Sequence, residues 1–220
     1  MGIISVEQAD RLYWLGRYTE RVYTTLRIFY RSFDTMIDEI TDSYREFCEM
    51  VDIPDIYGDK NTFLKKYPFD GDNPDSIVSN LNRAYDNAIV LRESIGSETL
   101  SYIQLALYEM NKAGESRAPL IELQHALDDL MAFWGTADDQ IDAEQIRNII
   151  KAGKRIERID LYARLGMKRE ALEREVHRMI PRVERCGLEY DPKRLESLKM
   201  LVGEPELNYY RIVREVEAVL

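Results

Sequence analysis

The chain reads Gly16-Arg17-Tyr18-Thr19-Glu20-Arg21 near its start, and the same pattern returns as Gly153-Lys154-Arg155-Ile156-Glu157-Arg158. The second copy follows the first at an offset of 153 − 16 = 137 residues. Arg27 returns as Arg164 at the same offset, 164 − 27 = 137. This recurrence indicates two equivalent helices, each with a small residue and a Glu-Arg pair in matched positions, that one fold can bring together about a pseudo-symmetric centre.

The apolar residues around the first copy recur at helical spacing. They run from Leu12 to Phe47 and share one side of a helix. The pattern predicts one long amphipathic helix that begins near Ser5 and ends before Pro54. Ser5 is a candidate cap for this helix, because Gln8 three residues later completes the capping-box pattern.

A long acidic connection is predicted over residues 52–75. Prolines, glycines and aspartates gather there, so the segment cannot hold a long regular element. We expect one short helical turn within it, over residues 63–67. A loop of this length in a compact domain is usually functional or mobile, and both a plain solvated loop and a docking surface stay open.

Helical spacing resumes after the connection, where Asp75 or Ser76 can cap the next helix. Further helices are predicted over residues 77–95, 119–134, 143–165, 170–183, 192–201 and 205–219. Whether residues 100–110 continue the first of these or form another helix is left open, and Gly135 is expected to end the helix over 119–134. No alternating strand pattern occurs, so the fold class is all-α, an antiparallel bundle of about six or seven helices.

Length and charge restrict the classes of function. The 220 residues can support one substantial core, which favours a single domain over residues 1–220. Lys and Arg number 30 against 40 Asp and Glu, so the net charge is 30 − 40 = −10. Such a charge repels nucleic acid and anionic membranes. We therefore expect a protein partner, no nucleic acid and no membrane.

Metal and cysteine chemistry have little support in the sequence. Cys48 and Cys186 form no close-spaced framework, which favours a reducing cytoplasm. Glu122 and His125 have the Glu-x-x-His spacing of di-iron helix bundles. Those sites need a second such pair and further carboxylates, and His177 has no Glu three residues before it. We expect neither a metal nor a cofactor.

The two copies differ in the surroundings of their charges. On the first helix Arg17, Glu20 and Arg27 lie nearly opposite the apolar side, which by itself favours a solvated face. On the second helix the neighbours of Glu157 include Ile150 and Leu161, and the other side is apolar as well. A helix that is apolar on both sides is buried, and a buried charge must be paired. Glu157 therefore needs a cationic partner.

Several partnerships are open for the two glutamates. Arg17 and Lys154 each lie three residues before the glutamate of their own helix. If the two helices pack antiparallel, with the glycines allowing close approach, an Arg of one copy can fork onto the Glu of the other. Three interpretations of these glutamates and arginines stay open: a structural ion network, a substrate site, and exposure on the surface.

At this point the residues resemble a known family, the alpha-E family of bacterial helical domains named for a Glu-Arg motif. Three blocks carry the resemblance: Leu12-Tyr13-Trp14-Leu15-Gly16-Arg17-Tyr18-Thr19-Glu20-Arg21, then Asn87 with Arg92-Glu93, and Gly153-Lys154-Arg155-Ile156-Glu157-Arg158. The likeness covers nearly the whole chain. The sequence departs from the family pattern at Ile89, Leu100 and Lys154, of which the last stands where the motif Arg is expected.

The resemblance implies a function by context. Members of the family are typically encoded beside a circularly permuted ATP-grasp ligase and a transglutaminase-like or related peptidase, which implies peptide or amide-bond metabolism. This chain has no phosphate-cradling glycine loop. We therefore expect a non-catalytic accessory or binding module with one of these proteins as partner. The alternative is an enzyme acting on an amide or peptide, with Glu20 and Glu157 as acid and base and an arginine clamp for a carboxylate.

The candidate site residues come from the three blocks and the positions that follow them. Tyrosines and Trp14 beside the first copy can line a pocket or simply pack. The proposed clamp consists of Arg21, Arg27, Arg158 and Arg164. The full candidate set comprises Tyr13, Arg17, Glu20, Arg21, Arg27, Asn87, Arg92, Glu93, Lys154, Glu157, Arg158 and Arg164.

Overall fold

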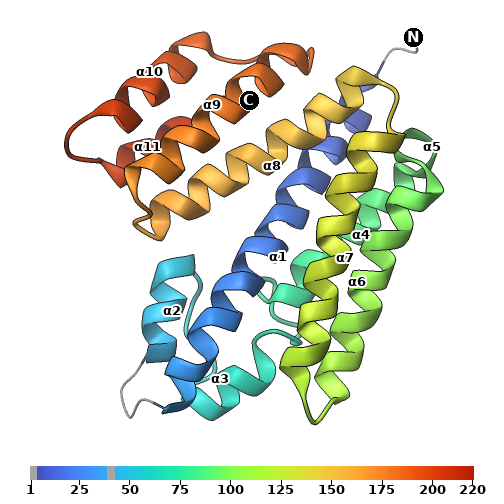
Figure 1. The fold of residues 1–220 in the computed structure, drawn as a ribbon, viewed down its shortest axis with the longest axis vertical. Helices are drawn as coiled ribbons and strands as arrows, with labels where there is room; N and C mark the ends of the chain where they lie inside the picture. Colours follow the sequence, from blue (N-terminus) through green and yellow to red (C-terminus); the bar gives the residue numbers. More distant parts are fainter. Residues whose placement is uncertain (1–3, 39–42) are drawn as a thin grey trace. The chain divides into compact units, whose positions relative to one another are not determined.

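The computed structural model describes residues 4–38 and 43–220. These described residues form eleven α-helices and no strand, so the all-α prediction is confirmed (Figure 1). The helix count exceeds the expected six or seven because shorter helices form between the long ones. None of the helices in the described ranges is long and apolar enough to cross a lipid bilayer.

The first long helix of the prediction corresponds to two helices. Helix α1 covers Val6–Asp38 and α2 covers Ser43–Val51, and Ile40, one of the apolar positions in the predicted run from Leu12 to Phe47, lies outside the described residues. The cap at Ser5 is confirmed, because the backbone N–H of Gln8 donates to its Oγ at 3.1 Å. Helix α2 ends just before Asp52, whose φ of 57° is left-handed and stops the helix.

The remaining helices follow the predicted order with shifted ends. They are α3 (Lys60–Lys66), α4 (Ile77–Val90), α5 (Arg92–Ile95), α6 (Ser97–Glu115), α7 (Pro119–Gln140), α8 (Glu144–Arg164), α9 (Arg169–Arg185), α10 (Pro192–Gly203) and α11 (Tyr209–Glu217). Ser76 is the cap of α4, and Gly96 with φ 83° separates α5 from α6. The prediction that Gly135 ends its helix is wrong. Helix α7 continues to Gln140, because one glycine costs a helix only about 1 kcal/mol and Ala137 is buried beyond it.

The chain divides into two compact units. The first unit consists of Met1–Glu20 and Ile141–Leu220, and the second unit of Arg21–Gln140. Helix α1 contributes its first part to one unit and its remainder to the other. The single domain over residues 1–220 stays a prediction.

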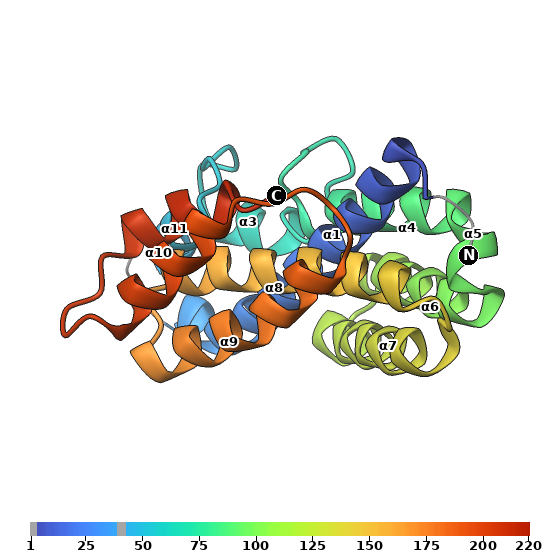
Figure 2. The same ribbon diagram turned by 90° about the horizontal axis from the view of Figure 1, so that it is seen from above.

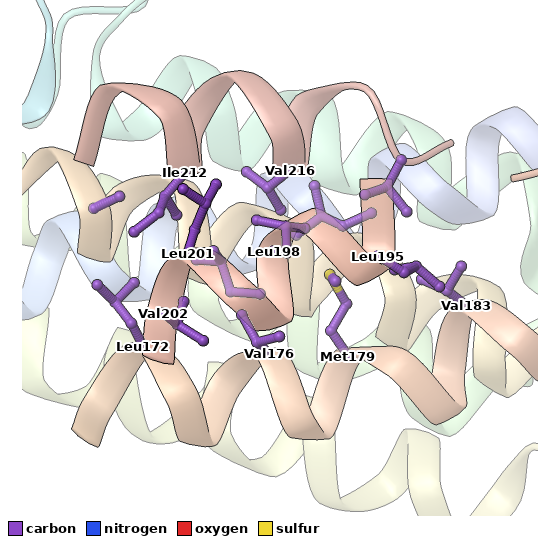
Figure 3. Close-up of a cluster of buried hydrophobic side chains, with 14 of the residues drawn as sticks. Leu172, Val176, Met179, Val183, Leu195, Leu198, Leu201, Val202, Ile212 and Val216 are labelled. Atoms are coloured by element: carbon purple, nitrogen blue, oxygen red, sulfur yellow. The ribbon is translucent and has the colours of Figure 1, made fainter. Parts of the chain in front are cut away.

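The first unit has its apolar core among its four C-terminal helices. Helix α9 returns antiparallel to α8, and α10 and α11 pack against this pair (Figures 1 and 2). Leu172, Val176, Met179, Leu198 and Ile212 meet in this core, and each is at most 1% exposed (Figure 3). Burial of such side chains contributes roughly 1.5–3 kcal/mol each, which holds α8 firmly in place.

The second unit contains an antiparallel hairpin of α6 and α7 and a cluster of aromatic side chains (Figure 1). Phe29 of α1 and Phe47 of α2 form this cluster with three aromatic residues of the acidic connection, Tyr57, Phe63 and Tyr67, and Phe63 stacks on Tyr67 at 4.9 Å. The predicted helical turn in the connection is confirmed as α3. The connection is therefore anchored by buried rings and is not a plain solvated loop.

Candidate functional site

The two copies of the repeated motif meet in the first unit, where α1 and α8 touch at their glycines. A Cβ on Gly16 would overlap the backbone carbonyl oxygen of Ile150, and a Cβ on Gly153 would overlap that of Tyr13. These two contacts are equivalent under the repeat, because 150 − 13 = 137 and 153 − 16 = 137. The helices thus approach to backbone contact about a local pseudo-two-fold axis, an approach that a glycine permits.

The two motif helices run in the same general direction as they cross (Figures 1 and 2). Arg17 pairs with Glu157 and, further along both helices, Glu20 pairs with Arg158, so the residue numbers rise together. The exchange of arginines between the two copies and the close approach of the glycines therefore occur, but in a parallel crossing and not in the antiparallel arrangement that the sequence analysis considered. In an antiparallel pair the glutamates would lie at opposite ends of the contact, out of reach of these arginines.

Arg158 and Glu20 form a two-pronged ion pair. The Nε and Nη2 atoms of Arg158 donate to Oε1 and Oε2 of Glu20 at 2.6 and 2.9 Å. The Glu20 side chain has no exposed surface, while that of Arg158 keeps 14%. This geometry matches the guanidinium fork to both carboxylate oxygens and is the strongest form of such a contact. The solvated reading of this helix face is wrong for Glu20.

Arg17 pairs with the second glutamate, Glu157, and lies beside two aromatic side chains. Its Nε donates to Oε2 of Glu157 at 2.6 Å, and its Nη1 donates to the hydroxyl of Tyr13 at 3.3 Å. The guanidinium also lies 5.3 Å from the ring centroid of Trp14. Burial lowers the pKa of Arg17, but Glu157 and Tyr13 raise it more, so its pKa lies above the ordinary value. Arg17 is therefore a permanent cation held by a buried anion.

A third buried acid, Glu175 of α9, extends the network and was missed from the sequence. Arg155 donates to its carboxylate, and Arg178 does so at 3.1 Å. Nη1 of Arg158 lies 3.9 Å from the same group, so Arg158 links Glu20 to Glu175. The sequence did contain a signal for this buried acid, because Glu175 lies beside Val176 on a helix whose other buried positions are apolar.

Asp160 carries the network toward the C-terminal helix α11. It accepts from Nε of Arg164 at 3.0 Å, and Nη2 of Arg164 lies 3.5 Å from Glu217. Burial, and then the charge of Glu157, raise the pKa of Asp160 to about 6. Arg164, a predicted site residue, is thus neutralised by two acids. Asp160 itself was not predicted, although it lies one turn before Arg164 on the same helix.

Lys154 occupies the position equivalent to Arg17 in the second copy. Burial lowers its pKa to about 7, and Arg158, Arg155 and Lys151 act in the same direction. Glu20 opposes this shift. A lysine with a pKa near 7 changes charge in the physiological range, and Asp160, with a pKa of about 6, does so at slightly lower pH.

The remaining predicted site residues belong to the second unit. Arg27 lies over the ring of Tyr23, and Arg21 lowers the pKa of Tyr67 against the larger effect of burial. Arg92 is exposed and donates to Ser97 at 2.9 Å. Glu93 is also exposed and Asn87 is half-buried. The structure thus brings together seven of the predicted residues within the first unit: Tyr13, Arg17, Glu20, Lys154, Glu157, Arg158 and Arg164.

The chemistry of this centre is that of a neutralised ion network. Glu20 and Glu157 both have 0% exposure; Arg158 donates to both oxygens of Glu20, and Arg17 donates to Oε2 of Glu157. In the described part of the chain, no group of three or more His, Cys, Asp or Glu side chains is arranged to hold a metal ion. The arrangement can hold the two helices in one register.

Comparison with known proteins gives one match. The model of the alpha-E family, described as a predicted alpha-helical domain with a conserved ER motif, matches residues 7–189. This range includes both Glu-Arg pairs of the repeat. No curated protein and no solved structure matches the chain.

Proposed function

The chain belongs to the alpha-E family, and from this premise we propose that it is a non-catalytic helical binding module. Its partner in this proposal is an ATP-grasp-type amide ligase or a transglutaminase-like peptidase of peptide or amide-bond metabolism. The Glu-Arg centre then serves as the clamp that fixes α1 against α8, and the partner supplies the chemistry.

One observation carries the non-catalytic part of the proposal. Glu20 and Glu157, the two candidate acid and base groups, are fully buried and each is held by an arginine of the other helix. A general acid or base must reach a proton on its substrate at hydrogen-bond distance. Carboxylates that have no exposed surface and that each accept from a guanidinium group are poorly placed for proton transfer to a substrate and well placed for a structural role.

The partner class is supported by the family resemblance and by the charge of the chain. A net charge of −10 favours association with a protein that presents a basic surface. The module itself lacks a glycine loop for phosphate, so ATP-dependent amide formation would reside in the ligase.

Co-purification tests the proposal. The chain is co-expressed with the ATP-grasp-type ligase encoded nearest to it, and complex formation is measured by size-exclusion chromatography with light scattering. The proposal expects a complex that weakens with salt, because charge steering is screened. Separate elution of the two proteins at low and high salt, repeated with the neighbouring peptidase, would overturn the partner assignment.

The enzyme alternative has its own test. Purified chain is incubated with peptides and simple amides, and release of amine is measured for the wild type and for Glu157→Gln. The binding-module proposal expects no turnover by either protein. Turnover by the wild type that is lost in a folded Glu157→Gln protein would instead assign catalysis to this centre.

A further inference from the structure

A second arginine-lined site lies in the second unit, in a cavity of about 200 Å³. Helix α1 lines it with Tyr23, Arg27, Tyr30 and Arg31, and α7 lines it with Gln124, Leu127 and Met131. The spacing on each helix is that of one face, so the cavity lies between two helix surfaces that look toward each other. It contains none of the residues of the buried ion network.

Among the side chains that the structure describes, no acid compensates the charge in this cavity. Arg27 and Arg31 both line it, and its described lining includes no carboxylate. Nη1 of Arg27 donates to the hydroxyl of Tyr23 at 3.4 Å. Among the described residues, neither guanidinium forms an ion pair with a carboxylate. The chain carries ten more acids than bases, so the lack of an acid here is a local feature and does not follow from composition.

The sequence repeat provides an internal comparison for Arg27. Its equivalent on α8, Arg164, also lines a cavity, but there Asp160 binds it at 3.0 Å and Glu217 lies at 3.5 Å. Tyr23 occupies the position of Asp160, because 160 − 23 = 137. Two carboxylates thus neutralise Arg164, whereas Arg27, at the equivalent position, donates to the hydroxyl of Tyr23.

Two like charges one helical turn apart repel each other, and a bound anion would relieve that repulsion. A guanidinium group matches the two oxygens of a carboxylate in a fork. On the α7 side of the cavity, two apolar side chains stand beside Gln124: Leu127, 6% exposed, and Met131, 58% exposed. A ligand that fits this lining carries a carboxylate at one side and an apolar group at the other.

The size of the cavity narrows the choice further. Pockets for whole drug-sized ligands measure about 300–1,000 Å³, and this cavity is smaller, so it fits the end of a longer chain. We infer that the Arg27–Arg31 cavity binds the C-terminal carboxylate of a peptide whose last side chain is apolar. The inference goes beyond the proposed function and holds whether or not the chain binds a ligase.

Calorimetry with matched probes tests the inference on the full chain. The probes are the tripeptide alanyl-alanyl-phenylalanine, its C-terminal amide, and inorganic phosphate. The inference expects the acid to bind at least about tenfold more tightly than the amide or phosphate. Equal binding of acid and amide, preferred binding of phosphate, or no heat from the acid would overturn it.

The repeat supplies the variants. Tyr23→Asp places a carboxylate where Asp160 stands, so it should neutralise Arg27 and weaken binding of the acid at least about tenfold. Arg27→Gln should give the same loss and serves as the test if Tyr23→Asp does not fold, as judged by circular dichroism. The control Arg11→Gln, whose side chain forms a surface ion pair with Glu7, should bind as the wild type does. Unchanged binding in a folded Tyr23→Asp or Arg27→Gln protein, or an equal loss in the control, would contradict the assignment.

Discussion

The guanidinium of Arg158 donates hydrogen bonds to both carboxylate oxygens of Glu20, at 2.6 and 2.9 Å. The two residues are 158 − 20 = 138 positions apart in the chain. This contact joins the two copies of the repeated motif. Arg17 and Glu157 form the second such contact, so each copy contributes one glutamate and one arginine to the pairing. Neither charge could be buried at acceptable cost without the other helix.

Removing one buried acid should therefore destabilise the fold. Glu157→Gln leaves Arg17 beside a neutral amide, and we expect the free energy of unfolding to fall by about 3 kcal/mol. Urea unfolding followed by circular dichroism measures this change. Glu7→Gln is the matched control, because Glu7 is 76% exposed and its ion pair with Arg11 lies on the surface. Equal stability of the two variants would contradict a buried structural pair.

The glycines at the crossing should tolerate no side chain. Gly16→Ala drives a methyl group into the carbonyl of Ile150, so we expect a loss of about 2 kcal/mol or more. Gly135→Ala in α7 is the control, since nothing lies within 4 Å of its Cβ position. There the higher helix propensity of alanine should raise stability by about 1 kcal/mol. Thermal unfolding of both variants distinguishes the effects, and a neutral Gly16→Ala would rule out backbone contact.

Thr19 is a position at which a substitution should maintain or increase the stability of the fold. Its hydroxyl is fully buried and has no hydrogen-bond partner among the described residues, and its equivalent in the second copy is Ile156. Thr19→Val removes this unpaired group at nearly constant volume, so stability should stay equal or rise by about 1 kcal/mol. Ser76→Ala is the contrast, because Ser76 caps α4 and its loss should cost about 1 kcal/mol. A destabilised Thr19→Val would show that this hydroxyl is in fact bonded.

Lys154 should make stability depend on pH. Burial, with the nearby cations, lowers its pKa from 10.5 to about 7. Between these values the unfolded chain binds more protons than the folded chain, so this group's contribution to stability rises with pH. We expect the free energy of unfolding of the wild type, relative to Lys154→Met, to increase from pH 7 to about pH 10. Urea unfolding at several pH values measures the difference.

An exposed lysine provides the control for this pH dependence. Lys199 keeps 43% of its side chain exposed in a surface ion pair with Glu196. The same comparison with Lys199→Met should give a difference that does not rise over this pH range. A flat difference for Lys154→Met as well would mean that Lys154 stays protonated in the folded chain.

The order of the helices was largely predictable because it depends on local information. The cap at Ser5, the cap at Ser76 and the helical turn over residues 63–67 follow from side chains within a few positions of one another. The helix past Gly135 was not predicted, since burial of Ala137 outweighs the small local cost of the glycine.

The sequence by itself determined that the fold is all-α, and it indicated two equivalent helices with Gly, Glu and Arg in matched positions, of which Glu157 needs a cationic partner. Only the tertiary structure decided that α1 and α8 cross in the same direction and that Arg17 pairs with Glu157. It also decided that Glu175 of α9 belongs to the same ion network. The physical reason is the distance along the sequence over which each interaction acts. Periodicity and caps report energies between neighbours in sequence, whereas the direction of crossing and the choice of ion partner depend on how the whole unit packs around its glycines and its core.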